Sequence, residues 1–516
     1  MIAMGKKRED RAKGRKTHVD RECDLDGDFK NPVRSFRDLN AGNVKEALLG
    51  SRYIQLLLSL TLIGAILRFY NLGYNSLWLD EASTLTFAVK SIPDIWQATT
   101  AGEFNPPLFY WAEHLMLTFG NSEFVLRFIP ALLGVLTIPL IYLAGKEFMD
   151  RNTGIIAAAA FAFSPFLVFY SQEARAYAMM LFFIAFAMVF YFRALKNGSI
   201  TDWALFGVLS ALAFWTHFYA MVMIGALVLY ALYELFPKIK SDVRSIQPLA
   251  AACGIFALVC LPLIIVTIQL FFRRSASSPT FGIQGPALIF ATFEQISCLN
   301  TAYPGAGLTM IIFLLLFIAG IIQATLLDMN KGVFLASVTI LMFVISNFLS
   351  YLIPMQPRYL ICLSIVFFIA VAISYRILWS LVSSPAVVYG LIALMVILNT
   401  PVLAGYYSAY TKDDWRGFSA GLQKQTQPGD IIAVIPGYIT QPFDYYYSNA
   451  TDQTIEYPAD TAADLRAISA LKGNNTLFVV VTGDIQAADP GGEAMQWLKE
   501  NTKSRGSITG IYLMSG

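Results

Sequence analysis

The sequence has few charged residues, a small net charge and few cysteines, and each shortage argues against a class of protein. Only 14% of the 516 residues are charged, whereas soluble globular proteins carry about 25%. A net charge of +2 gives no basis for a nucleic-acid partner. The five cysteines form no CxxC pair, so they suggest neither a disulfide framework nor a thiolate metal site. The sequence also lacks a Gly-x-x-x-x-Gly-Lys-Ser/Thr nucleotide loop, which argues against an ATP-driven pump.

Long apolar runs are what the sequence has in abundance. Hydrophobic residues make up 56% of the chain, and a helix needs about 20 mostly apolar residues to cross a bilayer. Residues 272–305 fall between the predicted spans and have room for a re-entrant or interfacial helix. We predict about eleven membrane helices, near residues 53–70, 124–144, 154–170, 177–195, 203–217, 219–236, 249–271, 306–327, 332–353, 359–378 and 386–404.

Basic residues set the predicted orientation, because lysine and arginine are enriched in the cytoplasmic loops of membrane proteins. The N-terminal stretch is rich in both residues and lacks the apolar core of a secretory signal. We therefore predict a flexible, basic cytoplasmic tail over residues 1–51 and a multi-pass protein of the cell membrane. The predicted loops on the same side as the tail carry Lys146, Arg151, Arg193, Lys196, Lys238, Lys240 and Arg244.

Two regions are expected outside the hydrocarbon. Residues 71–123 form a long outer loop, and its apolar pieces around Trp96 and Trp111 are too short to span, so they should lie along the membrane surface. After about Gly405 charged residues return, with apolar runs of strand length. The predicted fold is thus an all-α polytopic membrane domain over residues 52–404, followed by a small extracytoplasmic α/β domain over residues 405–516.

The first charged motif is Trp78-Leu79-Asp80-Glu81, which follows the first predicted span. A carboxylate at the membrane surface can act as a general base on an acceptor hydroxyl, and its neighbour can orient it. Both side chains also suit the first turn of an interfacial helix, where acidic groups are favoured. Taken alone, this motif leaves a catalytic base and a helix cap equally open.

Further ionisable residues fall at the same predicted outer ends. Burying an ionised group beside hydrocarbon costs roughly 2.5–3.5 kcal/mol, so such groups need a reason. Arg175 and Arg358 can each donate two hydrogen bonds to a lipid phosphate. Simpler roles are an ion pair between Glu173 and Arg175, snorkelling of Arg358, and packing of the lone His217.

Taken together, several motifs resemble glycosyltransferase family 39, which includes protein O-mannosyltransferases and lipid A aminoarabinose transferases. That family has the membrane fold called GT-C, so the resemblance implies this fold. The resemblance is clearest over residues 60–220. The motifs that carry it are Arg68-Phe69-Tyr70, Trp78-Leu79-Asp80-Glu81, Asn105-Pro106-Pro107-Leu108-Phe109-Tyr110-Trp111, Arg127-Phe128, Gln172-Glu173-Ala174-Arg175-Ala176-Tyr177, Arg358-Tyr359 and Asp413-Asp414-Trp415-Arg416.

The resemblance implies a polyprenyl-phosphate-linked donor of mannose or another hexose or pentose, and inverting transfer to a hydroxyl of a protein, lipid or glycan. It implies that Asp80 is the base, with Glu81 in the same acidic motif, and that Arg175 and Arg358 stabilise the departing phosphate. One position departs from the family pattern, since relatives often have lysine or histidine where this chain has Asn105. The other predicted substrate-binding residues are Glu103, Glu173, Tyr177, His217 and Tyr359.

This chemistry requires no cofactor. The acidic residues at the outer ends have oxygens that suit a divalent cation, but no spacing among them is diagnostic, and we predict no metal site. A transporter or lipid flippase should have ionisable residues near span midpoints and broken helices in matched halves. A non-catalytic scaffold would leave Asp80 and Arg175 as a cap and a snorkelling side chain. The charges at the outer ends and the order of the motifs favour the glycosyltransferase.

Overall fold

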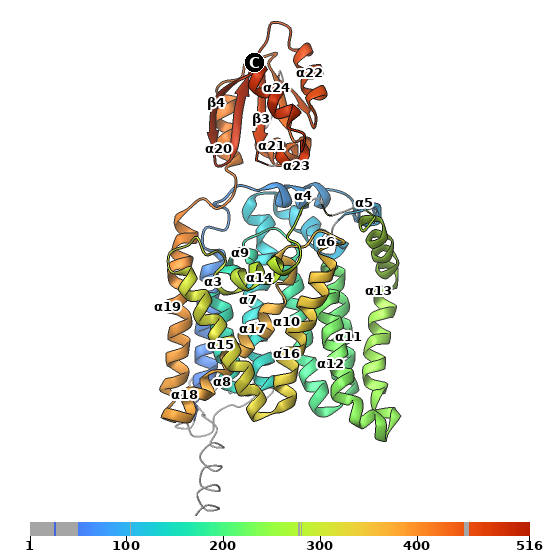
Figure 1. The fold of residues 1–516 in the computed structure, drawn as a ribbon, viewed down its shortest axis with the longest axis vertical. Coiled ribbons are helices and arrows are strands. Elements are labelled where there is room, and N and C mark those ends of the chain that lie inside the picture. Colours follow the sequence, from blue (N-terminus) through green and yellow to red (C-terminus); the bar gives the residue numbers. More distant parts are fainter. Residues whose placement is uncertain are drawn as a thin grey trace, which may run out of the picture.

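The structure is a computed structural model that describes residues 25–26, 50–103, 105–276, 279, 281–447, 454–483 and 485–516. A bundle of long apolar helices carries a small sheet domain at one end (Figure 1). Over these residues nine segments are long and apolar enough to cross a membrane, and a bent pair would make a tenth. Eight of the nine contain the helices α3 (Arg52–Phe69), α7 (Glu123–Phe148), α10 (Tyr177–Asn197), α12 (Ala220–Ser241), α13 (Gln247–Arg274), α15 (Ala306–Leu327), α16 (Met329–Leu349) and α19 (Ala386–Ser408), and the ninth is Leu363–Val382. The helix α11 (Ile200–Thr216) is apolar but shorter.

The helical bundle confirms the predicted fold class, with differences of detail in the third and tenth predicted spans. The third consists of α8 (Arg151–Phe163) and α9 (Pro165–Ser171), which meet at 61°. Pro165 has no backbone N–H, so it interrupts the helix there. The tenth begins with the short 3₁₀ helix η4 (Pro357–Leu360) and continues as α17 (Leu363–Ile373) and α18 (Tyr375–Val382). Within residues 272–305 lies α14 (Pro286–Cys298), in the region where the sequence left room for a helix.

The two ends of the bundle differ in what they carry. The end beneath the sheet domain, called the domain end below, also holds α4 (Leu79–Ala88), α5 (Ile92–Ala101) and α6 (Pro107–Met116), which lie between the bundle and the sheet domain (Figure 1). The opposite end, called the far end, holds the connections α7–α8, α10–α11, α12–α13 and α15–α16. Most of the predicted tail over residues 1–51 lies outside the described residues, so it stays a prediction.

The four cysteines in the described part of the chain are not paired with one another. Cys253 is exposed, and Cys260, Cys298 and Cys362 are buried. All four lie in helices or just before one, and Cys23 lies outside the described residues.

The C-terminal domain is a five-stranded sheet covered by helices on both faces. Its strands are β1 (Ile431–Ile435), β2 (Ile455–Pro458), β3 (Leu477–Thr482), β4 (Lys503–Ile508) and β5 (Ile511–Ser515), in the order β2-β1-β3-β5-β4. The pairs β1–β2 and β1–β3 are parallel, whereas β3–β5 and β5–β4 are antiparallel. Alternate residues of β1 and β3 pack against α20 (Trp415–Gln423) and α21 (Thr440–Tyr446) on one face, and against α22 (Ala462–Leu471) and α24 (Glu493–Asn501) on the other.

Candidate functional site

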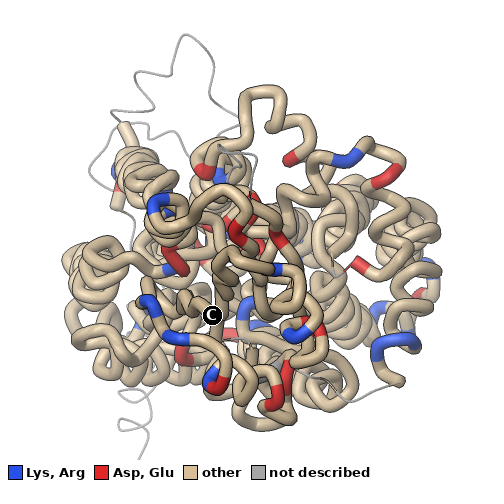
Figure 2. The backbone as a smooth tube through the Cα atoms, turned by 90° about the horizontal axis from the view of Figure 1, so that it is seen from above, with Lys and Arg blue, Asp and Glu red and all other residues tan. Residues whose placement is uncertain are grey.

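Acidic and basic side chains meet where the C-terminal domain lies over the domain end. Figure 2 looks down on the molecule from that end and marks its acidic positions in red and its basic positions in blue. Helix α4 supplies two adjacent carboxylates from its first turn, Asp80 and Glu81. Glu81 is fully buried, whereas the Asp80 side chain is 23% exposed. The two neighbours therefore have different surroundings.

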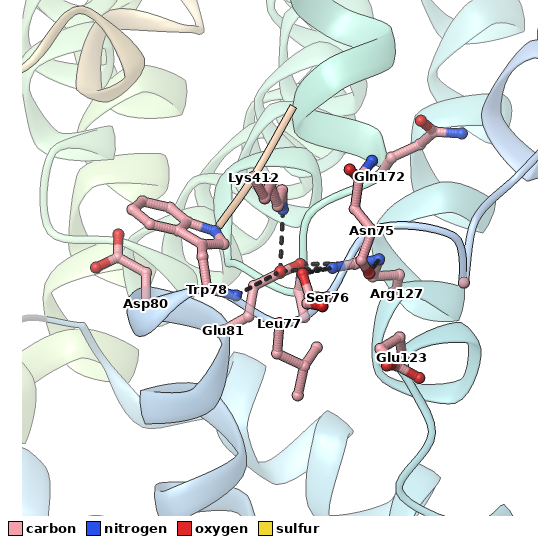
Figure 3. A network of polar contacts seen from close by, with 12 residues as sticks. Asn75, Ser76, Leu77, Trp78, Asp80, Glu81, Glu123, Arg127, Gln172 and Lys412 are labelled. Carbon is pink, nitrogen blue, oxygen red and sulfur yellow. Dashed lines mark hydrogen bonds and ion pairs between the residues drawn. The ribbon is translucent and has the colours of Figure 1, made fainter. Parts of the chain in front are cut away.

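Glu81 is held from three sides. Arg127 of α7 donates two hydrogen bonds to it, from Nε and Nη2, each at 2.7 Å. The backbone N–H of Ala174 donates a third at 2.8 Å, and the Lys412 ammonium lies 3.0 Å from Oε2 (Figure 3). Paired planar contacts of this kind are among the strongest that a carboxylate makes. Glu81 therefore joins α4 to α7, to the α9–α10 turn and to the segment that follows α19.

The charge of Glu81 is fixed by these partners. Burial alone would raise the pKa of Glu81, but Arg127 and Lys412 lower it to about 2. Burial lowers the pKa of Lys412, against the attraction of Glu81. A carboxylate whose oxygens already accept from charged donors is poorly placed to take a proton from a substrate. The geometry gives Glu81 an anchoring role.

Asp80 is held much more loosely. Its Oδ2 lies 3.4 Å from Arg358 Nη2 and 3.9 Å from Arg175 Nε. Arg358 comes from η4, and Arg175 comes from the turn between α9 and α10. Arg175 also donates from Nη1 to the Asp80 carbonyl at 3.2 Å, which fixes the guanidinium to the start of α4. The Asp80 carboxylate thus stands beside two cations and keeps exposed surface of its own.

Aromatic rings surround these arginines. Tyr219 and Tyr359 are stacked with their centroids 4.5 Å apart, and His217 lies 5.7 Å from Tyr359 and 5.3 Å from Tyr177. Burial, helped by Arg175 and Arg358, lowers the pKa of His217 to about 3. The imidazole is therefore neutral at ordinary pH and presents a flat, uncharged surface.

Several buried polar atoms in this part of the structure have no hydrogen-bond partner. They are Trp78 Nε1, both carboxylate oxygens of Glu173, the Tyr177 hydroxyl and Arg358 Nε. Burial raises the pKa of Glu173 to about 7, and the positive charge of Lys412 opposes that rise. Unpaired buried polar groups are costly, so their gathering at one place is typical of a site that binds a polar ligand.

Glu103 and Asn105 lie next to this group and share a contact with Tyr110. The Tyr110 hydroxyl donates to Glu103 at 2.6 Å, and Asn105 Nδ2 donates to the same hydroxyl at 3.3 Å. Arg274, at the end of α13, donates to the carbonyls of Gly102 and Glu103 at 2.7 and 3.0 Å. These bonds tie the second half of the long loop to the bundle.

A cavity of about 630 Å³ opens beside these residues, between α12, α13 and α16. Its polar part is formed by Asn105, Arg175, His217, Arg274 and Tyr359. The rest of its wall is mostly apolar and includes Met221, Val222, Ile268, Leu270, Phe271, Phe272, Ile345 and Leu349. A cavity with arginines at one end and a mostly apolar wall can hold an amphiphile with an anionic head group.

The structure brings together all ten residues proposed from the sequence, but two further groups were not foreseen as site residues. Lys412 lies 3.0 Å from the Glu81 carboxylate, and Arg274 lines the cavity. Arg274 ends a span at the domain end, against the general bias of basic residues toward the other end, and this exception was the available signal. Over the described residues no group of three or more His, Cys, Asp or Glu side chains is arranged to hold a metal ion.

Two comparisons of the sequence with known proteins each match part of the chain. The family model of dolichyl-phosphate-mannose-protein mannosyltransferases matches residues 105–266. A protein of Aquifex aeolicus (strain VF5), described only as uncharacterized, is 31% identical over 135 residues, which cover 25% of this chain and 27% of that protein. The match thus spans about a quarter of the length of the curated relative.

The overall structure is similar to that of solved membrane glycosyltransferases. ArnT from Cupriavidus metallidurans bound to undecaprenyl phosphate matches with a TM-score of 0.55 at 12% identity, over 90% of this chain and 98% of that one. The Archaeoglobus fulgidus oligosaccharyltransferase matches with a TM-score of 0.54 at 14% identity, over 91% of this chain and 75% of that one. The chain is a multi-span membrane protein with the GT-C fold, and the resemblance predicted from its motifs is confirmed.

Proposed function

We propose that this GT-C protein transfers a sugar from a polyprenyl-phosphate-linked donor to a hydroxyl group of a protein, lipid or glycan, with inversion at the anomeric carbon. The sugar is mannose or another hexose or pentose. Asp80 is the general base, and Arg175 and Arg358 stabilise the lipid phosphate as it departs.

The position of Arg175 is the observation that carries this proposal, because its side chain lies beside both the proposed base and the cavity. Its Nε lies 3.9 Å from the Asp80 carboxylate, and its side chain also lines the cavity between α12, α13 and α16. An apolar channel that begins at a guanidinium suits a polyprenyl chain with its phosphate at the head. The sugar attached to that phosphate would then lie beside Asp80.

The loose contacts of Asp80 suit the reaction. A lipid phosphate that enters the cavity competes for Arg175 and Arg358, whose 3.9 and 3.4 Å contacts with Asp80 are weak enough to exchange. Asp80 then accepts the proton of the acceptor hydroxyl while the hydroxyl oxygen attacks the anomeric carbon. The bond from that carbon to the phosphate oxygen breaks, and the electron pair stays on the phosphate between the two arginines.

The remaining residues would bind and orient the sugar. Neutral His217 with Tyr177 and Tyr359 offers flat surfaces for a sugar face, and the unpartnered Tyr177 hydroxyl can meet a sugar hydroxyl. Asn105 lines the cavity, and Glu103 shares a contact with it through Tyr110, so both would contact the sugar or the acceptor. The proposed chemistry uses no cofactor, so a chelator should leave transfer unchanged. The domain end would face the outside of the cell and the N-terminus the cytoplasm.

Sugar transfer by the purified full-length protein in detergent tests the proposal. The donors are polyprenyl-phosphate-linked sugars, beginning with mannose, and a membrane extract supplies the acceptors. We expect Asp80→Asn to lower kcat by about 10²–10⁴-fold, the usual contribution of a general base. The matched control is Asp94→Asn, an exposed aspartate in the first turn of α5 in the same loop. Full activity in Asp80→Asn would contradict the assignment of the base, and no transfer from any donor would contradict the function.

A further inference from the structure

Lys412 enters the site from the C-terminal side of the chain, beyond the last span. It lies between α19 and α20, and its side chain is only 6% exposed. Besides its 3.0 Å contact with Glu81, its ammonium lies 5.8 Å from the ring centroids of Trp78 and Phe169. It thus reaches between the start of α4 and the helix α9. Lys412 does not line the cavity.

The residues around Lys412 bind the segment that leads into α4. The Tyr410 hydroxyl lies 2.5 Å from both the backbone nitrogen and the hydroxyl of Ser76. The Thr411 N–H donates to Asn75 Oδ1 at 3.0 Å, and the Arg416 N–H donates to the Ser76 hydroxyl at 3.1 Å. Two segments more than 330 residues apart in sequence are therefore joined by a continuous set of hydrogen bonds.

The C-terminal domain itself makes a second set of contacts on the same loop. The Tyr446 hydroxyl accepts from the Leu77 N–H and donates to Glu123, both at 2.7 Å. Arg416 forms an ion pair with Glu123. Ser76 and Leu77 immediately precede Trp78, which begins the catalytic motif. The position of the C-terminal domain therefore determines where α4 starts.

Lys412 is one of four ionisable side chains that lie together between α4, α7, the α9–α10 turn and the segment after α19. Glu81, Glu173, Arg127 and Lys412 together carry two negative and two positive charges when ionised, and the first two are fully buried. Arg127 is committed to Glu81 through two hydrogen bonds. Glu173 has no hydrogen-bond partner, and Lys412 is the group whose charge most favours its ionised form. Lys412 thus pairs with Glu81, and its charge also favours the ionised form of Glu173.

We infer that Lys412 is a positioning residue, which holds the carboxylate of Asp80 in its reactive place by tying Glu81 to the C-terminal segment. The inference rests on the proposed function, because it assigns Asp80 as the base. Glu81 follows Asp80 in the first turn of α4, so a shift of Glu81 moves Asp80 through the helix backbone. Misplacing a catalytic group by about 1 Å can cost about 10²-fold in rate.

Steady-state transfer kinetics of Lys412→Met and Lys412→Arg test this inference. We expect Lys412→Met to lower kcat by about 10²-fold, with the KM for the polyprenyl-phosphate sugar changed less than about threefold, because Lys412 does not line the cavity. Lys412→Arg keeps the cation and should recover at least a tenth of the native kcat. The matched control is Lys424→Met, an exposed lysine of the same domain, which should be fully active.

A double variant separates positioning from simple stability. Lys412→Met removes the cation that most favours the ionised form of Glu173, and Lys412→Met with Glu173→Gln removes the carboxyl group as well. We expect the double variant to regain the native melting temperature while its kcat stays low, because the link to Glu81 is still missing. Recovery of kcat together with the melting temperature would overturn the positioning role. An equal loss of activity in Lys412→Arg and Lys412→Met would also overturn it.

Hydrogen exchange gives a readout that does not depend on activity. The amides of Glu81 and Ala82 donate to the Trp78 carbonyl at 3.0 and 2.9 Å, and they report on the first turn of α4. In Lys412→Met these amides should exchange at least tenfold faster, while those of α10 and α12 keep their native rates. Unchanged exchange would overturn the inference even if the native chain transferred no sugar. In that last case the absence of transfer would separately contradict the proposed function.

Discussion

The two ends of the helical bundle each place an aspartate beside arginine, but they hold it differently. At the far end Asp150 accepts from Arg376 at 2.5 and 3.1 Å and from the Tyr375 hydroxyl at 3.0 Å. The same carboxylate caps α8 by accepting from the Thr153 N–H at 2.7 Å. At the domain end the arginine nitrogen nearest to the Asp80 carboxylate, Arg358 Nη2, lies 3.4 Å from it.

This difference separates a structural carboxylate from a reactive one. Both carboxylate oxygens of Asp150 accept hydrogen bonds, and those from Tyr375 and Arg376 connect α8 to α18. A ligand could bind Asp150 only by breaking these bonds, which would lower the stability of the fold. Asp80 has long contacts with the arginines, exposed surface and unpartnered polar atoms nearby. A ligand that binds there can therefore supply hydrogen bonds that these atoms lack. The comparison predicts that loss of arginine lowers activity at the domain end and stability at the far end.

The largest effect is expected for Arg358→Ala at the domain end. Removing one donor that stabilises developing negative charge typically costs about 10²–10³-fold in kcat, and Arg358 stands at the proposed phosphate position. The melting temperature should change little, because the contact with Asp80 is long. Transfer kinetics and a thermal unfolding assay on the same preparation measure both quantities.

Arg358→Lys sharpens this prediction. Lysine keeps the charge but loses the fork of donors that matches a phosphate, so its kcat should fall between those of the native chain and Arg358→Ala. An Arg358→Ala variant with native kcat and a lowered melting temperature would mean that the domain end is built like the far end.

A smaller effect, and of the opposite kind, is expected for Arg376→Ala at the far end. Breaking the pair leaves Asp150 with fewer partners in a half-buried place, which should cost about 2–3 kcal/mol of stability. The kcat and KM of the folded fraction should equal those of the native chain, because the change lies at the opposite end from the cavity. A loss of kcat at native melting temperature would contradict the division between the two ends.

The hydrophobic pattern alone was enough to predict the bundle. Runs of about 20 apolar residues mark spans independently of how the helices pack, so their positions could be found locally in the sequence. The hydrophobic pattern does not report the bend before Pro165, which follows from the missing N–H of that proline, or the η4 segment at Arg358. The existence of a C-terminal sheet followed from apolar runs of strand length, whereas its strand order did not.

The site was only partly predictable for a related reason. Asp80, Arg175 and Arg358 could be proposed because each breaks an apolar context in a motif that resembles a known family. Apart from that resemblance, nothing in the sequence distinguished the roles of Asp80 and Glu81, since their different surroundings come from Arg127 and Lys412, which are distant in the chain. Lys412 stands among other charged residues after the last span, so its burial against Glu81 could not be read from its neighbours.

The smallest effect is expected for the pH dependence of Glu173→Gln at the domain end. The pKa of Glu173 is raised from 4.5 to about 7, so the folded protein holds this proton more tightly than the unfolded chain does. The stability that it contributes is therefore complete below pH 4.5 and is lost as the pH rises through about 7. A glutamine side chain at this position cannot ionise, so the variant should gain roughly 2 kcal/mol on the native chain between pH 5 and pH 8. Melting temperatures of both proteins across this range measure the gain. The control is Glu500→Gln at an exposed position, which should not change the melting temperature at any pH in this range. A gain in stability for Glu173→Gln that did not grow with pH would mean that Glu173 is held by a close cation or donor, as Asp150 is at the far end.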